Sequence, residues 1–143
     1  MEIMMFGMLC LPMSRGGFAC EGGISNYRIN FNEEATAVSS MPYAIGNLVF
    51  PASNEILEYK GHPHDSKESR IRNEKREVSL SAMGFRVTAI NSEQIKDAAA
   101  LETIAKRLYR QAGSRFRYYI DAYQTRQYQL MRELTTWMQG QSE

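Results

Sequence analysis

The chain of 143 residues contains only two cysteines, four prolines, two histidines and one tryptophan. Cys10 and Cys20 are too few for a disulfide framework and lack the spacing of a metal site, which favours a reduced, cytoplasmic setting. Long hydrophobic runs are also absent: the apolar start at residues 3–11 is far shorter than the roughly 20 residues that span a bilayer. Because Glu2 rather than a basic residue precedes it, a buried helix is favoured over a signal peptide, and no membrane partner is expected.

An excess of charge of one sign is lacking as well, since the formal net charge is +1. That value alone does not predict a nucleic-acid partner. The distribution of charge is more informative: residues 60–76 carry six basic residues against three acidic ones, and residues 106–132 carry seven against Asp121 alone. The 43% hydrophobic and 23% charged fractions are typical of a soluble globular protein. The length predicts a single domain over residues 1–143.

Local patterns predict an α/β domain with a mixed central sheet flanked by helices. A helix over residues 1–11 should end before Pro12, because proline pushes the preceding residue out of the helical region. The glycine-rich loop at 11–25 lacks the Lys-Ser/Thr of a phosphate-binding P-loop, so plain turns are favoured there. Apolar periodicity and turn residues give the remaining elements: strands at 27–31, 35–39, 48–50, 56–59 and 85–90, and helices at 65–83, 92–112 and 117–139. Residues 114–143 form a C-terminal helical extension.

The strand at 56–59 leads into two charged side chains that share one face. Residues two apart in a strand point the same way, so Leu57 and Tyr59 should face the core while Glu58 and Lys60 lie side by side opposite them. Beside a cleft, Glu58 could bind Mg²⁺ and Lys60 could orient the attacking water in phosphodiester hydrolysis. The simpler alternative is an exposed ion pair, worth under about 1 kcal/mol.

Two further positions extend this candidate site. The histidines at 62 and 64 could bind a metal, act as a general acid or contact phosphate, or they could belong to a plain exposed loop around Pro63. A metal-binding carboxylate is also expected on the preceding strand, where the sequence has Asn47. An asparagine can coordinate a metal through its amide oxygen, but it contributes no charge.

These residues resemble the very-short-patch-repair branch of the PD-(D/E)xK nuclease superfamily. The resemblance starts with LEYKGHPH at 57–64 and continues through Arg76, Leu80 and the Gly84-Phe85-x-Val87 turn. Earlier matches to longer bacterial proteins that carry such a domain lie at 9–12, 16–17, 26–29 and 47–51, and a later one lies at 107–117. The resemblance implies a restriction-endonuclease-like fold with extra C-terminal helices.

Carried over by position, the resemblance implies a role for each site residue. Glu2 matches the first-helix glutamate near the metal, Glu58 the second acid, Lys60 the lysine and His64 the downstream histidine. Asn47 and Asn73 stand where the family has aspartates. The implied catalytic residues are Glu58, Lys60 and His64, and the implied ligands of Mg²⁺ or Mn²⁺ are Glu2, Asn47 and Glu58. The match of Glu2 at the start of the chain suggests a missing N-terminal part.

Three functions remain open on the sequence. The first is a Mg²⁺-dependent DNA endonuclease, impaired by Asn47. The second is an inactive nuclease fold that binds nucleic acid or acts as a regulatory module. The third is an interaction fragment whose apolar first helix packs against a second copy or an absent domain. The candidate nucleic-acid contacts are Arg72, Arg76, Arg115 and Arg117; alternatively, the arginines form solvated helix faces while the tyrosines among them pack inward.

Overall fold

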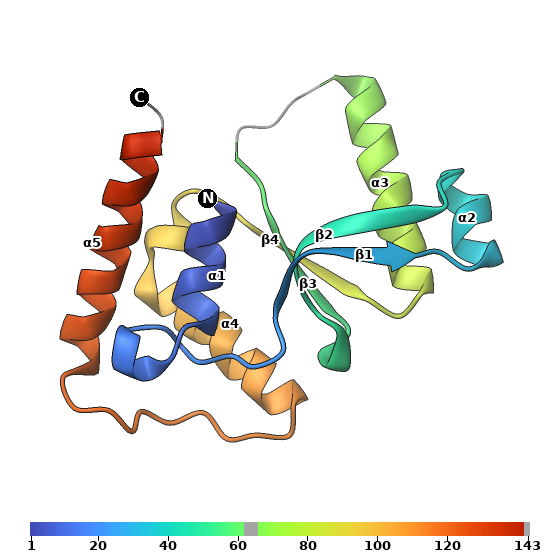
Figure 1. Cartoon of the computed structure of the whole chain (residues 1–143). Coiled ribbons are helices and arrows are strands. Elements are labelled where there is room, and N and C mark those ends of the chain that lie inside the picture. The colour runs from blue at the N-terminus through green and yellow to red at the C-terminus, as the bar shows by residue number, and fades with distance from the viewer. Residues whose placement is uncertain (62–65, 142–143) are drawn as a thin grey trace.

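The computed structural model describes residues 1–61 and 66–141. Its centre is a four-stranded mixed sheet in the order β1-β2-β3-β4, with helices on both sides (Figure 1). The strands β1 (Ile24–Asn30), β2 (Tyr43–Phe50) and β3 (Glu55–Tyr59) are antiparallel neighbours, whereas β4 (Arg86–Ile90) runs parallel to β3. The predicted α/β class, with a mixed sheet and C-terminal helices, is confirmed.

The helices form two layers, and each layer covers one hydrophobic cluster. On one side lie α1 (Glu2–Cys10), α4 (Ala98–Gln111) and α5 (Tyr123–Gln141); on the other lie α2 (Glu33–Ser39) and α3 (Lys67–Ala82) (Figure 1). The first cluster includes Met4, Met8, Leu48, Leu57, Leu101 and Leu130, and the second is Ile29, Ala44, Val49, Ile56 and Leu80. Because side chains alternate along a strand, Leu57 belongs to one cluster and its neighbour Ile56 to the other.

The end of α1 and the glycine pair after it follow from close packing. Leu11 is extended, with φ −66° and ψ 152°, as the residue before Pro12 was predicted to be. A Cβ atom on Gly17 would lie 2.1 Å from the Leu11 carbonyl oxygen, and one on Gly16 would lie 2.4 Å from the Arg126 carbonyl oxygen. This pair therefore serves the close approach of α1, its following loop and α5.

The prediction of a strand at 35–39 was wrong, because this segment lies in the helix α2. Asn32 caps the helix: its Oδ1 accepts a hydrogen bond of 2.9 Å from the Ala35 N–H. A hydrogen bond also connects α2 to α3, because the Ser79 hydroxyl of α3 donates to the Ala35 carbonyl oxygen at 2.7 Å. The short pattern at 35–39 did not distinguish a strand from a short helix in which only Ala35 and Ser39 are buried.

The two last helices begin later than predicted. The expected helix from Ser92 starts at Ala98, because Asp97 Oδ1 accepts from the Ala99 and Ala100 N–H groups and caps α4. The expected helix from Arg117 starts at Tyr123. The connection 112–122 is non-helical, and its rings at 116 and 118 pack against each other and against aromatic residues of the core.

Across residues 1–61 and 66–141, no helix combines the length and apolar character needed to cross a membrane.

Candidate functional site

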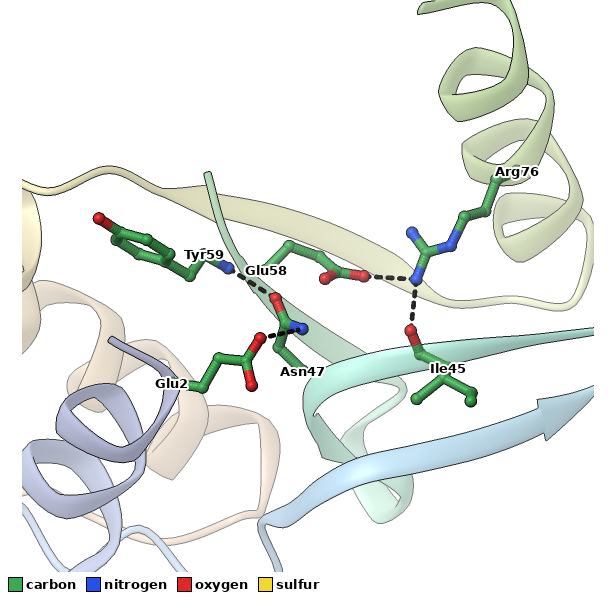
Figure 2. Close-up of polar contacts among 6 residues, drawn as sticks. All are labelled: Glu2, Ile45, Asn47, Glu58, Tyr59 and Arg76. Atoms are coloured by element: carbon green, nitrogen blue, oxygen red, sulfur yellow. Dashed lines mark hydrogen bonds and ion pairs between the residues drawn. The ribbon is translucent and has the colours of Figure 1, made fainter. Parts of the chain in front are cut away.

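Asn47 lies where β2 and β3 stop pairing. The antiparallel register ends at Leu48 opposite Leu57, so the next pair would be Asn47 and Glu58. Instead of a ladder bond, the side-chain Oδ1 of Asn47 accepts the Tyr59 backbone N–H at 2.9 Å. Its Nδ2 donates to Oε1 of Glu2 at 3.0 Å (Figure 2). The amide thus joins β2, β3 and the first turn of α1.

Glu58 is paired with an arginine from the opposite helical layer. Its Oε1 lies 2.6 Å from Nη2 of Arg76 on α3, and its side chain is only 8% exposed. The same Nη2 also donates to the Ile45 carbonyl oxygen at 2.8 Å. Figure 2 shows the Glu58 carboxylate turned toward Arg76, whereas the Glu2 carboxylate is turned toward Asn47. The alternative of an exposed Glu58–Lys60 ion pair is therefore wrong, because Glu58 forms a buried pair with Arg76.

Lys60 is exposed and follows directly after β3. Its backbone N–H donates to the Ile90 carbonyl oxygen at 2.9 Å, which continues the β3–β4 pairing by one residue. Within the part of the chain that the structure describes, its ammonium group forms no ion pair. His62 and His64, the second of which was predicted to be catalytic, lie outside the described residues.

The acids that the resemblance assigns to a metal do not fit a divalent ion in this arrangement. Mg²⁺ prefers oxygen ligands in near-octahedral geometry, and anionic ones strengthen its binding. The amide oxygen of Asn47 is bonded to an N–H group, and its amide nitrogen, which only donates, faces Glu2. One oxygen of Glu58 is bonded to a guanidinium. Among the described residues, no three acidic, histidine or cysteine side chains form a group that could hold a metal.

The four candidate nucleic-acid contacts do not form one surface. Arg72 is exposed on α3, while Arg76 is 18% exposed and bonded to Glu58. Arg115 and Arg117 are exposed in the connection 112–122. Figure 1 shows this connection, between α4 and α5, at the opposite end of the molecule from the start of α3.

The basic cluster at 106–132 is divided between structural and exposed residues. Arg107 lies 3.3 Å from Glu55, a carboxylate that is 1% exposed, and Arg126 donates to the Ser14 carbonyl oxygen at 2.9 Å. Among the tyrosines, Tyr109 and Tyr123 bond to backbone carbonyl oxygens of the 16–19 loop. Others are exposed: Tyr118, Tyr119 and Tyr128. Tyr109 and Tyr123 therefore pack inward, whereas nucleic-acid contact by the exposed residues stays a prediction.

Glu55 is the buried acid that the sequence did not reveal. Its Oε1 accepts from the Gln111 side chain at 2.8 Å, and its Oε2 lies 3.3 Å from Nη2 of Arg107. That Arg107 nitrogen also donates to the Thr88 hydroxyl at 2.8 Å. Glu55 lies between the predicted strands at 48–50 and 56–59. Its partners on α4 lie more than fifty residues further along the chain, so local spacing carried no signal for this network.

Asn73 is the second position where the sequence departs from the family pattern. Its side chain is exposed on α3, one turn before Arg76.

No family model matches the chain, and no curated protein or solved structure is significantly similar to it.

Proposed function

We propose that this chain is a nucleic-acid-binding module with a nuclease-like arrangement of strands and without metal-dependent hydrolysis in its present sequence. The observation that carries the proposal is the position of the Asn47 amide, which lies between Glu2 and the Tyr59 N–H. The amide N–H of Asn47 donates directly to the Glu2 carboxylate. An aspartate at position 47 would place two carboxylates together, and these would need a shared proton or a cation between them. The amide thus satisfies the polar groups without an ion.

The ion pair of Glu58 supports the same conclusion. Its carboxylate is neutralised by Arg76 at 2.6 Å and is mostly shielded from solvent. If this carboxylate moved to bind a cation, the largely buried guanidinium of Arg76 would lose its partner. This loss is costly because a charge in a low-dielectric environment needs an opposite charge beside it. The arrangement therefore favours a structural role for Glu58, which ties β3 to α3.

The nucleic-acid part of the proposal rests on exposed basic residues beside this site. We define the α3 basic surface as the exposed basic residues Lys67, Arg70, Arg72 and Lys75, which lie around more than one face of α3, together with Lys60 after β3. Three exposed acids lie on the same helix, Glu68, Glu74 and Glu77. Exposed basic side chains attract a phosphate backbone and release its counterions, which gives binding without base specificity. The partner class is nucleic acid, with DNA duplex as the first probe.

Binding is tested by fluorescence anisotropy of a labelled DNA duplex of about 20 base pairs over a series of salt concentrations. We expect affinity to fall steeply with salt, and the double variant Arg72→Gln/Lys75→Gln to reduce the slope of log K against log salt by about 1–2. The matched control is Lys96→Gln/Arg132→Gln, which removes the same charges from exposed positions elsewhere. Salt-independent binding, or an equal loss in the control, would contradict phosphate contacts at the α3 basic surface.

A second candidate, Mg²⁺- or Mn²⁺-dependent DNA hydrolysis, is favoured by one observation. Asn47 contacts Glu2 directly and stands at the position that the β2–β3 register would pair with Glu58 (Figure 2). The two candidates are separated by incubating supercoiled plasmid with the protein and either cation. Intact plasmid supports the binding module, whereas cleavage that Glu58→Gln abolishes would establish the hydrolase.

A further inference from the structure

A cavity of about 250 Å³ lies between the end of β2, the last turn of α4 and the connection 112–122. It is distinct from the candidate site, because Asn47 and Glu58 do not line it. Its volume is below the roughly 300–1,000 Å³ of pockets that hold drug-sized ligands, so it suits a single ring system with one substituent. The lining residues include the apolar and aromatic side chains of Phe50, Leu108, Tyr109 and Tyr119 and the polar side chains of Glu21 and Ser114.

The aromatic lining combines one fixed ring with one exposed ring. The hydroxyl of Tyr109 donates to the carbonyl oxygens of Phe18 at 2.6 Å and Ala19 at 3.2 Å, and its ring packs edge to face against Phe116 at 5.1 Å. Tyr119 is 63% exposed, and no hydrogen bond or ring contact with a described residue holds it. A planar ligand could therefore stack between the fixed ring of Tyr109 and the exposed ring of Tyr119.

The polar lining selects what kind of ring this would be. Glu21 is exposed at the cavity, and no hydrogen bond with a described residue occupies its carboxylate. A carboxylate accepts two parallel N–H donors, and the ring N–H and adjacent amino group of guanine provide them. Ser114 of the lining is followed in the chain by the exposed residues Arg115 and Arg117. The phosphate of a guanine nucleotide therefore has basic partners nearby.

We propose that this cavity binds a guanine base bearing a phosphate, with Tyr119 stacking on the ring and Glu21 accepting its N–H donors. The base has two possible sources, a free guanine nucleotide or an unpaired guanine of a nucleic acid. The second source rests on the proposed nucleic-acid binding, whereas the first does not.

Free nucleotides are tested first, by calorimetric titration of the intact chain with GMP and with AMP. We expect GMP to bind at least tenfold more tightly than AMP, because adenine offers a carboxylate one donor instead of two. Glu21→Gln should remove this preference. Tyr119→Ala should weaken both ligands about tenfold or more through loss of stacking. The matched control is Tyr128→Ala, which removes a tyrosine that is 67% exposed on α5 and does not line the cavity.

The source is identified with a hairpin DNA that carries one unpaired 3′ guanine. Binding that GMP displaces and Tyr119→Ala weakens assigns the cavity to nucleic acid; tight GMP binding without any effect on the hairpin assigns it to the free nucleotide. The inference is overturned if GMP fails to bind at millimolar concentration and hairpin binding is unchanged by Glu21→Gln and Tyr119→Ala. Salt-dependent hairpin binding that persists in that case would leave the α3 basic surface intact as a separate result.

Discussion

The side-chain amide of Asn47 donates a hydrogen bond of 3.0 Å to the Glu2 carboxylate, which joins the second strand of the sheet to the first turn of the first helix. The other end of the same amide accepts the Tyr59 N–H, so a single uncharged side chain satisfies one donor and one acceptor. The elements α1, β2 and β3 are therefore joined at this point by the hydrogen bonds of one side chain. This relationship leads to the first prediction.

Asn47→Asp should make folding stability dependent on a divalent cation. The substitution keeps an acceptor for Tyr59 but places a second carboxylate against Glu2, which should lower the free energy of unfolding by about 1–3 kcal/mol in EDTA. Millimolar Mg²⁺ or Mn²⁺ should restore it, since an ion that binds only the folded state stabilises that state. Urea unfolding with and without cation measures this. Asn73→Asp, an exposed change on α3, is the control; equal cation dependence in both variants would refute a site at Asn47.

The Glu58–Arg76 pair should show strong energetic coupling. Glu58→Gln and Arg76→Met each leave a poorly compensated partner, so we expect each to lower stability by about 3 kcal/mol. The double variant should lose about 1–3 kcal/mol less than the sum of the two. The reference cycle is Glu102→Gln with Lys106→Met, a pair at 3.6 Å that is more exposed than the Glu58 pair and whose Glu102 also accepts from Tyr118; the coupling there should stay below about 1 kcal/mol. Similar couplings in the two cycles would show that burial adds nothing to the Glu58 pair.

Gly17 should tolerate alanine less well than Gly22. A Cβ at Gly17 meets the Leu11 backbone oxygen at 2.1 Å, and backbone cannot move aside as a flexible side chain can, so we expect a loss of about 3 kcal/mol or more. Gly22 has φ +82° and open space around its position, so alanine should cost about 1–2 kcal/mol from backbone strain alone. Chemical unfolding of both variants gives the comparison. A smaller loss at position 17 than at position 22 would contradict the close packing of this loop.

Alkaline pH should destabilise the fold through its cysteines. Burial raises the pKa of Cys10 and Cys20 from 9.0 to about 12, with Cys10 adding to the shift at Cys20. Their protonated state therefore stabilises the fold fully below about pH 9, and this contribution is lost as the pH rises toward 12, because only the unfolded chain releases the protons. Burial likewise raises the pKa of Tyr109 from 10.0 to about 12, which adds a loss above pH 10.

The cysteine contribution is isolated by comparing Cys10→Ala/Cys20→Ala with the natural sequence between pH 8 and 10, in a reducing buffer. The variant loses stability in this range only through groups other than the two thiols, whereas the natural sequence also loses the contribution of the thiols. The variant should therefore show the smaller decrease. An identical decrease in the two proteins would assign the alkaline loss elsewhere.

Several features followed from the sequence because their causes are local. Pro12 ended α1, Gly84 adopted φ +89° directly after α3, and the alternating residues of β3 placed Leu57 in the core. Each depends on the backbone restrictions of one residue or on a period of a few residues. The α/β class followed from the same signals, although the helix α2 was predicted as a strand.

The tertiary structure alone decided what the charged and polar side chains do. Glu58 stood in the predicted strand on the predicted face, yet its partner is Arg76, eighteen residues away, and not its neighbour Lys60. Asn47 and Glu2 meet across forty-five residues. A local pattern can place a side chain on a face of the sheet, but the helix that covers that face determines whether the side chain meets water or an opposite charge. The chemistry of the site therefore depends on packing between distant segments, which no single stretch of the sequence contains.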